Sequence, residues 1–395
     1  MAIRKSSIQD IDLSGKRVFL RVDFNVPLRD GEVADDARIK ASLPSLRHLL
    51  ERNCRVVLAS HLGRPKAKRN PALSLRPAAE RLSQLLGRSV PLAPDCTGPE
   101  VAARIAGLSP GECLLLENLR FHAGEEQNDP EFARQLALPH EAYVNDAFSA
   151  SHRRHASVAG IVEHLTTAVA GLLMQREIEA LSHVLFDPPK PYAAVLGGAK
   201  VSDKVRLIKT LLLKVDRILI GGAMAYPFLA AQGISTGESL LEAQTVETAR
   251  SLLGEAGELN VELHLPVDHR VVRDPRSKEP SRSTDSEAIE AGWAAVDIGP
   301  RTEQRFAEAL RDCRCVLWNG PLGFFERGEL AGSRAIAEAA VSGKAFTVAG
   351  GGDTAALLHA LGIAGRFSHL STAGGAAIEF LSGKTLPGVQ ALSDR

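Results

Sequence analysis

Basic and amide side chains follow several apolar runs of this sequence, where the strands of a parallel sheet would end. Arg21, Asp23 and Asn25 alternate after the first such run, so we expect all three on one side of the chain. Polar and charged groups on an otherwise apolar strand are costly to bury unless they meet a ligand or one another. The other members of this set in the first half of the chain are Arg38, His61, Arg64, Arg120 and Arg153.

The charge of this set indicates what it would bind. Like charges do not gather at one edge of a sheet without a counter-anion. The planar fork of an arginine matches a phosphate or a carboxylate group. The sequence therefore predicts a site for a small anionic substrate in the first half of the chain.

Two other interpretations apply to parts of this set. A structural Arg–Asp pair that caps the first strand would also explain the segment Arg21–Asn25. His152 and His155, three residues apart, suggest a metal site, but the neighbouring arginines would repel a cation and no third ligand is evident. We therefore expect the two histidines to pack or to form hydrogen bonds.

Glycines take the place of arginines after the apolar runs of the second half. Gly197 and Gly198 would allow the backbone to approach a ligand closely. Ser202 is a candidate N-cap for the helix that follows, with Lys200 and Lys204 one helical turn apart. The next apolar run closes with another glycine pair, Gly221 and Gly222.

The segment Gly350–Thr354 joins a further strand end to a helix start. Free N–H groups at such a start bind phosphate, and Asp353 could carry Mg²⁺ held by a nucleotide. A role of Asp353 as N-cap is the alternative.

The segment Gly383-Lys-Thr385 resembles the end of a P-loop, but it is not a Walker A motif. Ile378 occupies the position of the first glycine, and the segment follows a helix, Gly375–Leu381, where a P-loop follows a strand.

The elements that would position these residues alternate between short apolar runs and amphipathic segments, which is typical of βαβ units. Strands are expected at Arg17–Phe24, Arg55–Ser60, Glu112–Glu117, Ala142–Asp146, Pro191–Gly197, Arg217–Gly221, Val261–Pro266, Cys315–Asn319 and Ala345–Ala349. Helices are expected at Asp36–Arg52, Leu75–Leu86, Ser202–Lys214 and Thr302–Asp312. The sequence predicts an α/β fold with two Rossmann-like three-layer domains, largely parallel sheets and a hinge helix between them.

A helical segment from about Thr166 to Val184, which ends before Asp187-Pro-Pro-Lys-Pro191, marks the expected connection between domains. We expect a substrate-binding domain over 1–165, an interdomain helix over 166–187, a nucleotide-binding domain over 188–380 and a tail over 381–395 that returns to the first domain. The polar stretch Arg273–Ser286 has no periodicity and is expected to be a surface loop. Because the two sites lie in different domains, hinge closure is expected when both ligands bind.

Composition limits the class of partner. The 395 residues include 47 Lys plus Arg and 47 Asp plus Glu, so net charge predicts no general attraction to nucleic acid or to a membrane. The start of the sequence lacks the pattern of a secretory signal, and no stretch is long and apolar enough for a membrane helix. The five scattered cysteines are expected to be buried thiols of a cytoplasmic protein.

Taken in order, these segments resemble the phosphoglycerate kinase family from Arg17 to Val389. The segments that carry the resemblance are RVDFNVP, SHLGRP, LLENLRFHAGEE, NDAF followed by HR, LGGAKVSDK, WNGPLGFFE, GGGDT and GKTLPGV. The resemblance implies a monomeric kinase that interconverts 1,3-bisphosphoglycerate plus ADP with 3-phosphoglycerate plus ATP, with Mg²⁺ as cofactor.

The resemblance also implies roles for residues at matching positions. Phosphoglycerate would be bound by Arg21, Asp23, Asn25, His61, Arg64, Arg120 and Arg153, with Arg38 nearest to the transferring group. The nucleotide would be bound by Gly198, Lys200, Lys204, Gly221, Gly222, Asn319, Pro321, Glu326, Gly351, Gly352, Asp353 and Thr354. Arg38, Lys200 and Gly352 would be catalytic, and Asp353 would hold Mg²⁺ with the nucleotide.

Two other classes of function are weighed against a kinase. A dehydrogenase with two Rossmann-like domains requires a G-x-G-x-x-G segment after the first strand, and this sequence has none there. A non-catalytic binding protein descended from a kinase would be expected to lack charged groups such as Arg38, Lys200 or Asp353, and all three are present.

Overall fold

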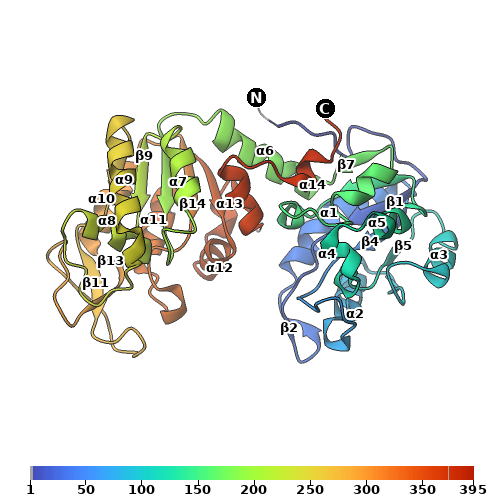
Figure 1. Ribbon diagram of the computed structural model, residues 1–395, viewed down its shortest axis with the longest axis horizontal. Coiled ribbons are helices and arrows are strands. Elements are labelled where there is room, and N and C mark those ends of the chain that lie inside the picture. The colour runs from blue at the N-terminus through green and yellow to red at the C-terminus, as the bar shows by residue number, and fades with distance from the viewer. Residues whose placement is uncertain (1–2, 372) are drawn as a thin grey trace. The chain divides into compact units, whose positions relative to one another are not determined.

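The computed structural model describes residues 3–371 and 373–395, which fall into two compact units. Ile3–Glu179 together with Thr385–Arg395 form the first, which we call the arginine unit. Ala180–Lys384 form the second, the glycine unit. Each contains a parallel sheet with flanking helices, and this confirms the predicted fold class (Figure 1).

The sheet of the arginine unit has five parallel strands in the order β5-β4-β1-β6-β7. The strands are β1 (Arg17–Arg21), β4 (Arg55–Ala59), β5 (Cys113–Leu115), β6 (Ala142–Asn145) and β7 (Ala168–Ala170). The helices are α1 (Ala37–Glu51), α2 (Arg76–Leu86), α3 (Pro99–Ala106), α4 (Ala123–Gln127) and α5 (Pro130–Ala137), and a hairpin is formed by β2 (Leu28–Arg29) and β3 (Glu32–Val33).

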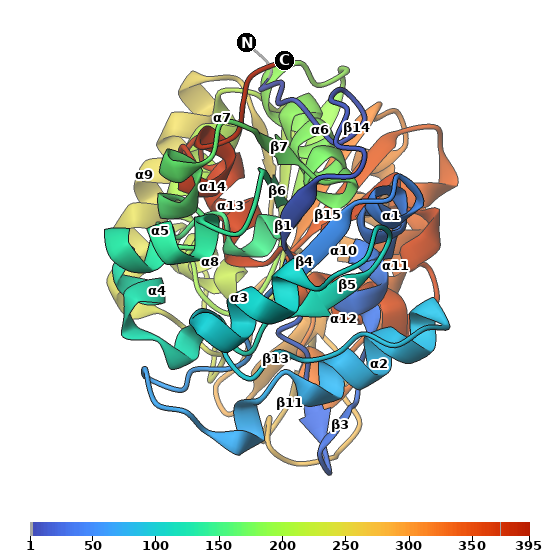
Figure 2. The ribbon, with the colours of Figure 1, turned by 90° about the vertical axis from the view of Figure 1, so that its right-hand side faces the viewer.

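Both faces of the central strand β1 are covered by helices (Figure 2). Val18 and Leu20 point to one face and belong to a core cluster that includes Leu46 of α1. Phe19 points to the other face, where its ring stacks on Tyr143 with centroids 6.0 Å apart. Burial on both faces explains why the sequence reads here as a continuous apolar run.

The main sheet of the glycine unit has six parallel strands in the order β10-β9-β8-β14-β15-β16. They are β8 (Tyr192–Leu196), β9 (Arg217–Ile220), β10 (Glu262–His264), β14 (Cys315–Asn319), β15 (Phe346–Gly350) and β16 (His369–Ser371). The helices are α7 (Val205–Leu212), α8 (Tyr226–Ala231), α9 (Val246–Glu258), α10 (Pro300–Leu310), α11 (Ala331–Ser342), α12 (Gly352–Ala360) and α13 (Gly375–Leu381). None of the helices in the described residues is long and apolar enough to span a bilayer.

A second, antiparallel sheet in the glycine unit was not predicted. It joins β11 (His269–Val272), β12 (Arg282–Ser283) and β13 (Ala294–Ile298) in the order β12-β11-β13. The predicted loop Arg273–Ser286 therefore contains a short strand. β12 has two exposed polar residues and forms because it pairs with β11, so no local pattern marks it.

The connecting helix α6 (Leu172–Phe186) begins later than the sequence predicts. The preceding residues form β7 and pair with β6. The helix starts where Oδ1 of Asp146 accepts from the N–H groups of Leu173 (2.9 Å) and Met174 (3.2 Å). This cap comes from the end of β6, distant in the sequence, so local propensity could not fix the boundary.

The C-terminal segment Thr385–Arg395 clusters with the arginine unit. It contains the short helix α14 (Pro387–Gln390). The N–H of Gly388 donates to the Ser151 carbonyl at 2.9 Å, and the Asn145 amide group donates to the Gly388 carbonyl at 3.3 Å. The tail is thereby bound to the segment that follows β6.

We expect Gly388→Ala to lower the free energy of unfolding by about 1–3 kcal/mol, the usual cost of an overpacked site. The added Cβ would lie 2.6 Å from a methyl carbon of Val158 and 2.8 Å from the backbone Cα of Ser151. Urea denaturation followed by circular dichroism measures the effect. Gly254→Ala is the control, because nothing lies within 4 Å of its added Cβ. Equal stability of the two variants would contradict the prediction.

Candidate active site

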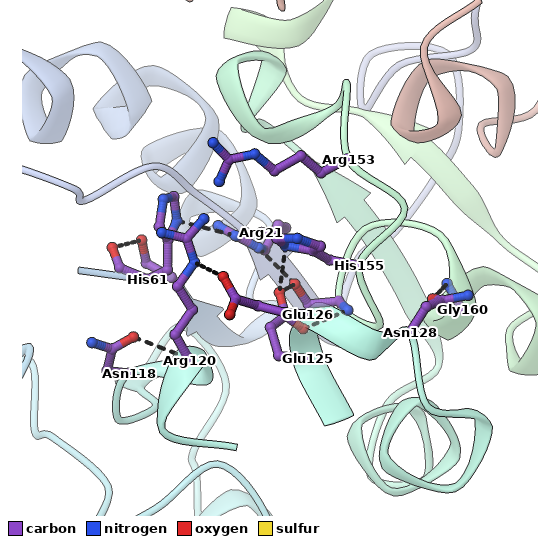
Figure 3. Close-up of polar contacts among 12 residues, drawn as sticks. Arg21, His61, Asn118, Arg120, Glu125, Glu126, Asn128, Arg153, His155 and Gly160 are labelled. Atoms are coloured by element: carbon purple, nitrogen blue, oxygen red, sulfur yellow. Dashed lines mark hydrogen bonds and ion pairs between the residues drawn. The ribbon is translucent and has the colours of Figure 1, made fainter. Parts of the chain in front are cut away.

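Arg21, at the end of β1, is only 1% exposed, yet it is held by neutral groups (Figure 3). Its Nε donates to Oγ of Ser157 at 2.8 Å, and that hydroxyl donates to Glu125 at 2.6 Å. Its terminal nitrogens contact the Val22 carbonyl and, at 3.3 Å, Nδ1 of His61. The acid therefore reaches this guanidinium group through a serine hydroxyl, and the arginine keeps its capacity to bind an anion.

Arg120 is a second buried guanidinium group beside Arg21 (Figure 3). One terminal nitrogen donates to the Gly63 carbonyl at 2.7 Å, and Nε lies 3.4 Å from Glu126. Burial, followed by the charge of Arg153, lowers the pKa of Arg120 to about 10. Asn118 accepts from the N–H of Arg120 at 3.1 Å and also bonds the loop after β4, which fixes the turn that presents this side chain.

Two histidines of the cluster, His61 and His155, are neutral at pH 7. Burial, and then the charges of Arg21 and other arginines, lowers the pKa of His61 well below its usual range. Because the guanidinium group of Arg21 can only donate, Nδ1 of His61 accepts. The same causes lower the pKa of His155 to about 3. His152 accepts from Nε of Arg153 at 3.1 Å. The positive charge of the site therefore lies on its arginines.

The Arg–Asp pair of this region joins α1 to the chain after β1. Arg38 contacts the carboxylate of Asp23 at 2.6 Å, and Ser149 donates to the same carboxylate. Asp23 therefore pairs with Arg38, and the alternative strand-capping pair within the segment Arg21–Asn25 does not form. The side chain of Arg38 is 35% exposed, so this arginine remains accessible.

The remaining predicted residues differ in how they are held. Asn25 accepts from the N–H of Gly63 at 2.9 Å, which ties the chain after β1 to the loop after β4. Arg64 is exposed and Arg153 is half-buried. All of these residues follow the carboxyl ends of β1, β4, β5 and β6 or begin α1, so the predicted set gathers at one sheet edge.

Three residues that hold the anion site were not singled out from the sequence. Asn118 and Glu125 lie within the quoted segment LLENLRFHAGEE, so their motif was visible although their role was not. Ser157 carries no signal, because only the folded chain brings its hydroxyl between Arg21 and Glu125.

The loops that follow the strands of the glycine unit pack backbone against backbone. A Cβ on Gly197 would lie 2.1 Å from the Pro321 carbonyl oxygen. Gly222 has φ of +67°, and a Cβ there would lie 2.9 Å from the amide nitrogen of Gly198. These positions require glycine because strand ends meet one another, in addition to any approach of a ligand.

A pocket of about 270 Å³ opens beside these loops. Five predicted residues line it: Gly198, Gly222, Pro321, Glu326 and Asp353. Apolar side chains that sequence reasoning missed complete the lining, among them Tyr226, Leu240 and Phe324. A mostly apolar pocket with a few charged groups at its edge suits a flat heterocycle attached to a polar chain. Gly221 is not among the lining residues, and a Cβ added to it would lie 2.7 Å from a methyl carbon of Leu322.

The two predicted lysines are not one helical turn apart, because α7 begins only at Val205 with Lys204 as its N-cap residue. Ser202 is not the N-cap, since its hydroxyl and its N–H bond Glu242 instead. Lys204 donates to the carbonyls of Gly197 and Asn319, and burial lowers its pKa to about 8. Lys200 is exposed on the loop before it.

Among the described residues, no side chain caps the backbone N–H groups at the start of α12. Gly351 occupies the N-cap position, so Asp353 is not the N-cap and its exposed side chain faces the pocket. Thr354 is buried, donates to the Gly350 carbonyl at 2.9 Å and accepts from the N–H of Gly320 at 2.8 Å. Asn319 donates to the same carbonyl at 2.6 Å. Gly352 faces open space.

The fold and the two sites define a class. A parallel α/β unit with an arginine-rich anion site, joined to a second with a glycine-lined pocket and a free helix start, is the arrangement of a phosphotransferase. The family model "Phosphoglycerate kinase" matches residues 8–384. The chain belongs to the phosphoglycerate kinase family, a phosphotransferase family whose acceptor is a carboxyl group and whose reaction is that of glycolysis.

Curated relatives and solved structures that are similar to this chain carry the same family name as the matching family model. The chain is 53% identical to the phosphoglycerate kinase of Solibacter usitatus over 392 residues, 98% of each chain. It is 50% identical to that of Moorella thermoacetica, over 99% of this chain and 100% of the relative. The structure of phosphoglycerate kinase from Coxiella burnetii superposes with a TM-score of 0.90 at 39% identity, and that from Pyrococcus horikoshii with 0.86 at 33%, each covering 98% of both chains.

The lowered pKa of His155 predicts an acid-dependent loss of stability. As pH falls from about 6.5, the unfolded chain takes up a proton that folded His155, with a pKa of about 3, does not. We expect His155→Gln to reduce the slope of unfolding free energy against pH by up to about 1.4 kcal/mol per pH unit in this window. Urea denaturation at several pH values measures it.

His164→Gln serves as the matched control, because His164 is exposed. The slope of unfolding free energy against pH in the His164→Gln variant should equal that of the unmodified protein. A His155→Gln slope that is indistinguishable from the control would show that His155 is protonated in the folded state at mild pH.

Proposed function

We propose that the arginine unit binds 3-phosphoglycerate, and 1,3-bisphosphoglycerate in the reverse direction, through the predicted arginines. The observation that carries this proposal is the burial of Arg21 with a serine hydroxyl, a carbonyl and a neutral histidine as partners. Arg21 makes no ion pair within the part of the chain that the structure describes. A dianionic phosphate would supply the missing counter-charge with bidentate geometry. Asp23, Asn25, His61, Arg64, Arg120 and Arg153 would orient the remaining polar groups of the ligand.

The pocket of the glycine unit is proposed to bind the nucleoside of ATP or ADP. Its apolar lining would cover the base, and Glu326 at its edge would accept from the ribose hydroxyls. Lys204 carries a charge at pH 7 and lies beside Gly198, so it would contact the phosphates. The N–H groups that follow Gly351 would hold the phosphate chain. Gly221, Gly222, Asn319, Pro321 and Thr354 would shape this site.

Mg²⁺ is the usual partner of a nucleotide, and we propose that Asp353 holds it. The donor chemistry fits, because an exposed carboxylate at the pocket edge is the ligand type that Mg²⁺ prefers. The ion would neutralise phosphate charge, while this chain's own residues orient the two reactants.

The proposed chemistry requires no paired base and nucleophile. The acceptor in the ATP-consuming direction is a carboxylate, which is already ionised at pH 7. Phosphoryl transfer then depends on positioning and on charge stabilisation around the transferring oxygens. We assign that stabilisation to Arg38, to Lys200 and to the backbone at Gly352. Arg38 belongs to the arginine unit and Lys200 to the glycine unit. Closure of the two units is therefore part of the proposed cycle.

The proposal includes a monomer that works in the cytoplasm. Cys54, Cys96, Cys113, Cys313 and Cys315 are all buried free thiols. Unpaired thiols are typical of a reducing compartment, which supports this location.

Arg38→Ala and Lys200→Ala should each lower kcat by on the order of 10²–10³, the effect of losing one preorganised charge contact. A coupled assay of 3-phosphoglycerate with ATP and Mg²⁺ measures kcat. The controls are Lys40→Ala and Lys209→Ala, two exposed lysines in surface ion pairs. Turnover within about threefold of the unmodified enzyme in either test variant would contradict the assigned role.

Asp353→Asn should raise the Mg²⁺ concentration that gives half-maximal turnover by at least about tenfold, because an amide is a weaker ligand for this hard cation. The variant keeps its shape, and the N-cap of α12 is Gly351, so the helix should be unaffected. Turnover is measured at saturating nucleotide over a range of Mg²⁺ concentrations. Glu338→Gln, an exposed change on α11, is the control, and an identical Mg²⁺ dependence of the two variants would exclude Asp353 as the ligand.

A further inference from the structure

A mixed cluster of possible metal ligands lies in the arginine unit, outside the residues assigned to the reaction. Asp95 and Cys96 come from the loop before α3, and His122 comes from the turn before α4. One carboxylate oxygen, the sulfur and one ring nitrogen of these residues lie within 4.8 Å of one another. Phosphoryl transfer to a carboxylate uses no thiol or imidazole at this place, so the cluster needs a different explanation.

The present partners of the three groups are ones that a metal can replace. Nε2 of His122 lies 2.6 Å from Oδ1 of Asp95. The thiol of Cys96 donates to the Glu117 carbonyl at 2.9 Å. A cation between the three would take the place of the proton between Nε2 of His122 and Asp95, which would leave to solvent while the neutral imidazole carries its proton on Nδ1. It would also displace the thiol proton to solvent, leaving a metal–thiolate bond.

The charges around the Cys96 sulfur favour a cation. The carboxylates of Asp95, Glu125 and Glu117 place negative charge near it. This negative field would stabilise a divalent ion bound to the sulfur. Arg69, whose guanidinium group lies 3.8 Å from Asp95, is 58% exposed, and it donates to the Pro94 carbonyl, so its contact with Asp95 lies on the solvent side of the cluster.

The cluster is ordered on one side and open on the other. The ring of His122 stacks on Phe132 with centroids 4.9 Å apart, which fixes its orientation. Cys96 is buried, whereas the side chains of His122 and Asp95 are 30% and 39% exposed and leave a path for an ion. The buried sulfur on the closed side and the half-buried ligands on the open side would leave room for water to complete the coordination.

We propose that Asp95, Cys96 and His122 form a site for a thiophilic divalent cation such as Zn²⁺ or Co²⁺. One sulfur, one nitrogen and one oxygen ligand form a donor set that suits these ions and does not suit Mg²⁺, which prefers oxygen ligands alone. The site is therefore separate from the nucleotide-bound Mg²⁺. It adjoins the anion site, because His122 follows Arg120 by two residues.

Titration of the full-length protein with Co²⁺ tests the proposal. We expect a thiolate-to-cobalt charge-transfer band that saturates at one equivalent and disappears when Zn²⁺ is added. Cys96→Ser should abolish the band, and His122→Gln should weaken Co²⁺ binding at least about tenfold. Cys113→Ser is the matched control, because Cys113 is another buried free thiol of the same unit.

The absence of a band in the unmodified protein would overturn the proposal. So would a band that survives Cys96→Ser, or one that is lost in Cys113→Ser. Circular dichroism establishes that each variant is folded. If Cys96→Ser fails to fold, folded His122→Gln decides the matter: unchanged Co²⁺ affinity in that variant would exclude the site.

Discussion

The guanidinium group of Arg21, buried without a direct carboxylate partner, is the constraint on which the arginine unit depends. Moving a charge out of water is costly, and a direct ion pair would be the simplest compensation. Arg21 is instead held by a serine hydroxyl, a carbonyl and a neutral imidazole. Glu125 contributes its charge one hydrogen bond away, through Ser157. This arrangement keeps the arginine ordered while leaving its charge available to a ligand.

Other features of the unit follow from that constraint. Histidines beside buried arginines cannot also be charged, and the pKa values of His61 and His155 are lowered accordingly. The turn that carries Arg120 must be fixed by neutral groups, and Asn118 does this with its amide. Arg38 makes a direct ion pair with Asp23 and is the more exposed group. That difference fits a residue that approaches the transferring phosphoryl group from the edge of the site.

In the glycine unit, the proposed nucleotide site combines apolar side chains with groups of the backbone. Strand ends approach one another closely at Gly197 and Gly222, and the start of α12 has no side-chain cap to occupy its N–H groups. The antiparallel strand β13 adds apolar lining to the pocket. In the proposed function, a phosphate chain would meet N–H groups directly, with Lys204 and Asp353 as the charged groups beside it.

The order of elements and the positions of the charged residues were determined by the sequence itself. Apolar runs marked the strands of both parallel sheets, apart from the short edge strands β7 and β16. Polar residues after the runs marked, in each sheet, the edge at which we propose a site. Tertiary structure alone decided where α6 begins, because its cap is Asp146 from another strand. It also decided that Ser202 bonds Glu242, that β12 pairs with β11, and that Ser157 reaches Arg21. Each of these outcomes depends on a partner distant in the chain, and local patterns carry no information about such partners.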